Sequence, residues 1–152
     1  MIYIEQDYLD YVGVPIRIED LNFLFRETLK SSKFCKHLDS KKIFLDVSVI
    51  DRKEIKRVNS EYRSKNSSTD VISIGEYSDD KDISKETKTE IFLGEILLSW
   101  DDIYENVDGK NVECEFFYVY IHGILHLLGY KHGDDMFSLQ DDIIDRFCLS
   151  YS

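Results

Sequence analysis

Three of the chain's four histidines lie in one short segment, Y-I-H-G-I-L-H-L-L-G-Y-K-H, at His122, His126 and His132. The four-residue spacing places His122 and His126 one turn apart on the same face of a helix. Gly129 can end that helix in the left-handed conformation, and His132 follows after a short turn. Three neutral imidazoles leave one position of a tetrahedral zinc ion open to water, as in catalytic zinc sites. We therefore predict one Zn²⁺ held by these three histidines.

The spacing also matches the metzincin protease motif H-E-x-x-H-x-x-G-x-x-H. Gly123 stands where those proteases carry the glutamate that acts as general base in peptide hydrolysis. The pattern therefore favours a metal hydrolase other than a metzincin, and a metallopeptidase remains an alternative. Nickel, copper and iron also accept nitrogen donors, so the ligand set does not decide which ion is bound.

Hydrophobic periodicity predicts the elements around this segment. Strands are expected near Ile2 and Ile4 and over residues 43–50, 70–75 and 91–99. Helices are expected over about 16–31, from an Asp51 cap to the break at 66–69, over 112–128, and through Leu139, Ile143 and Phe147. Ile55, Val58 and Tyr62 should form the buried stripe of the second helix. Residues 31–42 and 76–90 read as polar connections, and Gly94 indicates a bulge or a close backbone approach.

These elements predict a single α+β domain over residues 1–152. A small mixed sheet of about four strands should pack with about five helices. Residues 112–128 are apolar nearly all round, which is typical of a covered helix. The metal-binding helix is therefore expected at the centre of the fold.

Composition sets further bounds on function. A net charge of -11 argues against a general polyanion binder. Cys35, Cys114 and Cys148 include no C-x-x-C pair, so we expect three reduced cytosolic thiols packed as small hydrophobic side chains. No signal peptide, membrane-spanning segment or nucleotide cofactor is expected, and the predicted location is cytoplasmic.

Upstream of the histidines, the stretch 52–65 is locally basic. It is either a solvated helix face or a docking stripe for a nucleic-acid backbone. Within it, the planar charged fork of Arg63 suits phosphate oxygens, although an arginine also favours a helix C-terminus on the surface. Asp70 could orient a ligand histidine or cap a turn.

With these residues in view, the chain resembles the YbeY family, whose hallmark is H-G-x-L-H-L-x-G-Y-D-H. Residues 122–132 match that pattern except at Lys131, where the family has aspartate. V-N-S-E-Y-R at 58–63 resembles the family's L-N-x-x-Y-R, and T-D-V-I-S-I at 69–74 resembles T-D-V-L-S-F. L-G-E-I-L-L-S at 93–99 is similar to L-G-D-I-x-I-S.

The resemblance implies a zinc-dependent, single-strand-specific endoribonuclease acting in 16S rRNA 3′-end maturation and ribosome quality control. It implies an α+β fold, zinc on the three histidines and an essential catalytic arginine at Arg63. The implied partners are single-stranded rRNA and the ribosome or its small-subunit proteins. A non-catalytic ribosome-assembly factor with a structural zinc is the first alternative. Water and the substrate's own 2′-hydroxyl both remain open as the attacking group.

Lys131 puts a cation beside the third histidine, which is unfavourable near a metal ion unless the flexible side chain turns its ammonium away. We predict that Lys131 points to solvent, where it could touch a phosphate. Asp134 or Asp135 would then supply the carboxylate that the motif lacks.

Overall fold

The computed structural model describes residues 1–107 and 111–148. Its strands are β1 (Tyr3–Asp10), β2 (Lys42–Ile50), β3 (Val71–Ile74) and β4 (Glu90–Ser99). Its α-helices are α1 (Ile18–Ser31), α2 (Cys35–Leu38), α3 (Arg52–Arg63), α4 (Trp100–Glu105), α5 (Val112–Leu128) and α6 (Asp134–Cys148). Two short 3₁₀ helices, η1 (Glu76–Ser78) and η2 (Ile83–Lys85), lie between β3 and β4.

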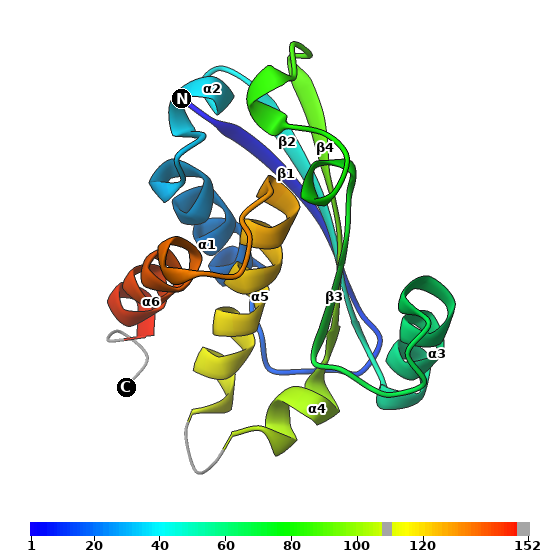
Figure 1. Ribbon diagram of the computed structural model, residues 1–152. Coiled ribbons are helices and arrows are strands. Elements are labelled where there is room, and N and C mark those ends of the chain that lie inside the picture. The colour runs from blue at the N-terminus through cyan, green and yellow to red at the C-terminus, as the bar shows by residue number, and fades with distance from the viewer. Residues whose placement is uncertain (108–110, 149–152) are drawn as a thin grey trace.

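The four strands form one mixed sheet in the order β1-β2-β4-β3. β1, β2 and β4 are parallel, and β3 pairs antiparallel with β4 at the edge. Helices α1, α5 and α6 lie on one side of the sheet and α3 on the other (Figure 1). The α+β class, the single domain and the mixed four-stranded sheet are thus as predicted.

Helix α5 is central because almost its whole circumference is apolar and covered. Its buried residues include Phe116, Tyr120, Ile124 and Leu127, which belong to the main hydrophobic core. The Asn111 side chain accepts hydrogen bonds from two backbone N–H groups of the first turn, which caps the helix. The other end is Gly129 at φ 105°, in the left-handed conformation that was predicted.

Two glycines allow α5 to approach the sheet closely. Gly94 has φ 148°, and the β2–β4 register shifts beside it, so the predicted bulge is present. At Gly123 a Cβ atom would lie only 3.1 Å from Ser73 Oγ and from Ile96 Cδ1. A glutamate at position 123 would therefore need these sheet residues to move. The glycine that replaces the protease general base therefore also allows close packing of α5 on the sheet.

Several local expectations differ from the structure. Helix α2 interrupts the predicted 31–42 connection, and buried Tyr77 and Ile83 anchor the 3₁₀ turns in the predicted 76–90 loop. Tyr62 is wrong as a member of the buried stripe of α3. It is 67% exposed, and Asn59 is buried beside Ile55 and Val58 instead.

The expectation of three separate thiols is also wrong, because Cys114 and Cys148 form a disulfide while Cys35 is free. The cysteines are 34 residues apart, but the start of α5 lies against the end of α6, and their Cα atoms are 6.0 Å apart. This proximity depends on how two helices pack, which cysteine spacing alone does not reveal.

In the described ranges, no helix is both long and apolar enough to cross a membrane.

Candidate metal centre

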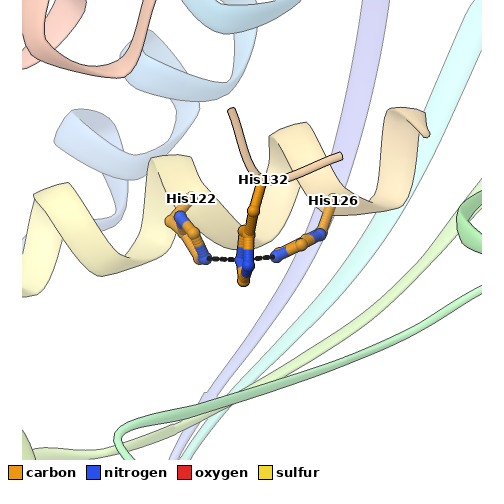
Figure 2. A group of neighbouring side chains, drawn as sticks. All are labelled: His122, His126 and His132. Atoms are coloured by element: carbon orange, nitrogen blue, oxygen red, sulfur yellow. Dashed lines mark hydrogen bonds between the residues drawn. The ribbon is translucent and has the colours of Figure 1, made fainter. Parts of the chain in front are cut away.

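The structure brings together the three histidines that the sequence singled out. His122 and His126 project from one face of α5, and His132 returns toward them from the turn beyond Gly129 (Figure 2). Nε2 of His132 lies 2.8 Å from Nε2 of His126 and 3.3 Å from Nε2 of His122. Among the histidine, cysteine, aspartate and glutamate side chains in the described part of the chain, these three histidines are the ones that lie close enough together to hold a metal ion.

The donor set fits a metal such as zinc. Two nitrogens bound tetrahedrally at about 2.0–2.1 Å from one zinc ion would lie roughly 3.3 Å apart. The His122–His132 separation of 3.3 Å already matches, and the 2.8 Å separation requires His126 and His132 to part slightly. All three rings turn the same nitrogen, Nε2, toward the centre, as one ion would require.

The environment favours the neutral imidazole that a metal needs. Burial lowers the pKa of His126 to about 4, with further lowering by the two other histidines and by Arg63. Burial also lowers the pKa of His122, although the Gln140 hydrogen bond and the charge of Asp70 oppose that shift. Both rings are therefore neutral at pH 7, so no proton has to leave them before an ion binds.

Gln140 orients His122, and the sequence reasoning missed this residue. Its Oε1 lies 3.1 Å from His122 Nδ1, and its Nε2 donates to the Tyr118 carbonyl at 3.1 Å. Because a carbonyl can only accept, the amide nitrogen must face Tyr118 and the amide oxygen must face His122. Nδ1 of His122 therefore carries the proton, and its Nε2 lone pair points into the centre.

Phe137 is the second residue that was missed. Its ring lies nearly parallel to those of His122 and His132, at centroid distances of 6.3 and 5.8 Å. Phe137 and Gln140 are three residues apart on α6, so one helix face supplies both. For Gln140, the sequence did hold a signal: a glutamine stands among the apolar residues that form the buried stripe of α6. A buried amide requires hydrogen-bond partners, so this glutamine could have been expected to contact another polar group.

Lys131 points away from the histidines, as predicted. Its ammonium donates to the backbone carbonyl of Ser78 on η1 at 3.1 Å, and its side chain is exposed. Within the described ranges, neither Asp134 nor Asp135 hydrogen-bonds to a histidine. Hydrogen bonding therefore gives no support to the predicted substitute carboxylate, and the neutral amide of Gln140 orients a different ligand, His122.

Asp70 was considered either as a residue that orients a ligand histidine or as the cap of a turn. Its charge opposes the lowering of the pKa of His122, but the Nδ1 atom of that ring pairs with Gln140 and not with Asp70. The backbone N–H groups of Asp70 and Val71 favour the charged form of the Asp70 carboxylate and oppose the rise of its pKa, in keeping with a cap. Burial raises the pKa of Asp70 itself.

Arg63 ends α3, and the left-handed Ser64 follows it. The guanidinium is exposed, and its charge contributes to the lowered pKa of His126. The rest of the basic stretch is partly neutralised. Arg52 pairs with Asp102 at 2.6 Å and Glu105 at 2.8 Å, and Arg57 pairs with Glu54 and Glu61, the two glutamates of α3. Within the described ranges, no carboxylate forms a salt bridge with Arg63.

The family model for endoribonuclease YbeY matches residues 12–148, and so includes every residue of this centre. The chain belongs to the YbeY family. Endoribonuclease YbeY of Levilactobacillus brevis is 32% identical over 153 residues, covering 90% of this chain and 92% of that protein. Endoribonuclease YbeY of Staphylococcus aureus is 32% identical over 157 residues, covering 95% and 96%. Its YbeY relatives are thus hydrolases of RNA phosphodiester bonds.

Among solved structures, TM1509 from Thermotoga maritima superposes with a TM-score of 0.59 at 25% identity, covering 97% of this chain and 91% of that one. The α+β fold expected for a YbeY protein is therefore present over nearly the whole chain. Its three histidines lie close enough together to bind a metal ion, in keeping with a metalloprotein family.

Proposed function

We propose that this YbeY protein is a zinc-dependent endoribonuclease that cleaves single-stranded rRNA, with Arg63 as a catalytic residue. The observation that carries the proposal is the convergence of three Nε2 atoms in a chain of the YbeY family. Arg63 is exposed at the end of α3, and its charge contributes to the lowered pKa of His126. His122, His126 and His132 would hold the ion. A peptidase is disfavoured because Gly123 stands where the general base would be, and a side chain there would require Ser73 and Ile96 to shift.

Each residue has a defined task in this proposal. His122, His126 and His132 would hold a zinc ion through three neutral nitrogens, and the bound ion would supply Lewis acidity toward a phosphoryl oxygen or a water molecule. Arg63 binds the phosphodiester from the α3 side and offsets negative charge that develops on its oxygens. Gln140 keeps the proton of His122 on Nδ1, and Asp70 adds a negative charge near that ring.

Within the cell, we propose action on 16S rRNA 3′-end maturation in the cytoplasm, together with the ribosome or small-subunit proteins. The local basic character of α3 supports an RNA substrate on a protein of net charge -11. The rival is an assembly factor that binds rRNA without cutting it, in which zinc is structural. The open position on a three-histidine site favours the enzyme.

The decisive experiment compares cleavage of a single-stranded rRNA fragment by zinc-loaded wild-type protein, Arg63→Ala and Arg63→Lys. We expect Arg63→Ala to lose about 10²–10³-fold in kcat, because a preorganised donor to the developing charge is lost. Arg63→Lys should retain part of the activity, and all three proteins should bind zinc equally. Equal cleavage by wild type and Arg63→Ala would mean that the activity comes from a contaminating nuclease, which would favour the assembly-factor rival.

The chemistry of the cleaved ends identifies the attacking group. A 2′,3′-cyclic phosphate on the product identifies attack by the substrate's 2′-hydroxyl. A linear phosphate from the first turnovers identifies attack by water. Gel electrophoresis of the cleavage products from the single strand and from a duplex of equal sequence measures the preference for single strands. We expect this preference to be large.

A further inference from the structure

Phe137 is an exposed aromatic side chain placed against two of the three metal ligands. It lies in the first turn of α6, and 40% of its surface is open to solvent. Its ring makes angles of 20° with that of His122 and 24° with that of His132. Other aromatic side chains of this protein are also exposed, but Phe137 lies against two of the candidate metal ligands.

The position of Phe137 is fixed by the helix that carries it. Gln140 on the same helix face is 1% exposed and bonds both His122 and the Tyr118 carbonyl, which holds α6 against α5. Met136 is fully buried next to it, and the Cys114–Cys148 disulfide ties down the far end of α6. The aromatic ring is therefore presented in a set orientation.

The ring is only partly used by its neighbours. Centroid distances of 5.8 and 6.3 Å belong to offset contacts, in which the rings overlap incompletely. Phe137 keeps 40% of its surface exposed beside the centre, so part of a flat, polarizable side chain is open to solvent there. Nucleobases stack on such surfaces in proteins that bind single-stranded nucleic acids.

Phe137 flanks two of the three candidate ligands, His122 and His132. A single strand with its phosphodiester at the ion would therefore pass close to this ring. The ring could then accept the base next to that phosphodiester.

We infer that Phe137 is a stacking platform for a nucleobase next to the cleaved phosphodiester, a role that rests on the proposed function. A base within a duplex is stacked and paired, whereas a base in a single strand is free to turn onto the ring. The platform therefore gives the enzyme a physical reason to prefer single strands. It asks only for a π-face, so any of the four bases fits.

The test combines protein variants that remove the Phe137 ring with oligonucleotides that lack one nucleobase, so that the two losses can be compared singly and together. Wild type, Phe137→Leu, Phe137→Ala and Phe137→Trp, all zinc-loaded, are titrated by fluorescence anisotropy with a short single-stranded 2′-O-methyl oligonucleotide and with copies carrying one abasic site each. Phe137→Leu and Phe137→Ala should bind about tenfold more weakly, and Phe137→Trp should remain within about twofold of wild type. One abasic position should cost wild type about tenfold and Phe137→Leu no more than about twofold.

Two controls separate the platform from a merely structural role. Phe92→Leu removes another exposed ring, 55% open, from the sheet, and should leave RNA affinity unchanged. Zinc affinity, measured by competition with a chelator, should be the same in Phe137→Leu and wild type. The platform is overturned if the leucine variant binds RNA like wild type. It is also overturned if zinc affinity falls in parallel, or if abasic sites weaken both proteins equally.

The outcome for the proposed function is read separately. If wild-type protein binds no single-stranded oligonucleotide at all, the proposed function as an enzyme of single-stranded RNA is wrong. If wild type binds and the ring makes no difference, only the platform fails.

Discussion

The molecule holds two clusters of ionisable side chains that differ in how they are arranged. One is the histidine triad of α5 and the following turn. The other is a carboxylate row, formed by Asp7, Asp46 and Glu95 at directly opposed positions on β1, β2 and β4. Burial and the charge of the preceding carboxylate raise the pKa of Asp46 and of Glu95.

The two clusters differ in geometry, which explains why only the histidine triad is a candidate metal centre. Neighbouring strands hold side chains about 4.7–4.9 Å apart along the sheet, so three carboxylates form a line. The helix period and the turn after Gly129 instead aim three nitrogens at one point. Neutral imidazoles also gather without mutual repulsion, whereas carboxylates do not. Convergence, more than the number of ligand-type residues, marks the site.

The largest expected effect comes from breaking the triad. His126→Ala removes one of three ligands, and we expect zinc affinity to fall by at least about 10³-fold and RNA cleavage to be lost. In differential scanning calorimetry, saturating zinc should stabilise wild type, by roughly 4 kcal/mol at a thousand times its Kd, but not His126→Ala. Asp46→Asn should respond to zinc like wild type. A lost zinc response in Asp46→Asn would mean that the carboxylate row binds the ion.

A smaller effect is expected when the triad keeps its ligands but loses their orientation. Gln140→Ala leaves Nδ1 of His122 without an acceptor, and we expect zinc affinity to fall about 10–100-fold. Chelator competition measures the affinity, and ¹⁵N chemical shifts report which nitrogen of His122 carries the proton. Ile143→Val, also in the buried stripe of α6, is the matched control for packing and should keep both values. An unchanged tautomer in Gln140→Ala would contradict the orienting role.

The smallest effect concerns the carboxylate row. Because the pKa of Asp46 is raised in the folded protein, the fold holds that proton more tightly than the unfolded chain. Stability is therefore lost as pH rises from 3.8, the ordinary pKa of an aspartate, through the folded pKa of Asp46. Asp46→Asn should stabilise the protein by about 0.5 kcal/mol at pH 7, and by nothing well below the ordinary pKa of an aspartate. Urea unfolding at the two pH values measures this, and destabilisation at pH 7 would contradict the electrostatic account.

The difference between the clusters also explains how much could be predicted from sequence. His122, His126 and Gly129 are related by the period of one helix, so their geometry could be read from spacing. The strands, the Asp51 cap and the apolar α5 could likewise be read locally, and the structure confirms them. Only Tyr62, at the last turn of α3, departs from its predicted stripe and stands in solvent.

Features that depend on helix packing could not be predicted in this way. Gln140 meets His122 across 18 residues, and Cys114 meets Cys148 across 34, because α6 packs against α5. Lys131 was placed correctly by a charge argument, but its partner, the Ser78 carbonyl, required the position of η1. Asp134 and Asp135 were chosen by their nearness in sequence to His132, but within the described ranges neither hydrogen-bonds to a histidine, and the orienting amide of Gln140 contacts His122.

Metal analysis of protein purified without a polyhistidine tag tests the central claim most directly. Plasma mass spectrometry of the folded protein, with His126→Ala prepared in parallel, gives the metal content per chain. One zinc ion per chain in wild type and none in His126→Ala is the predicted result. Folded wild-type protein that takes up no stoichiometric metal ion, even after incubation with zinc, would contradict the account.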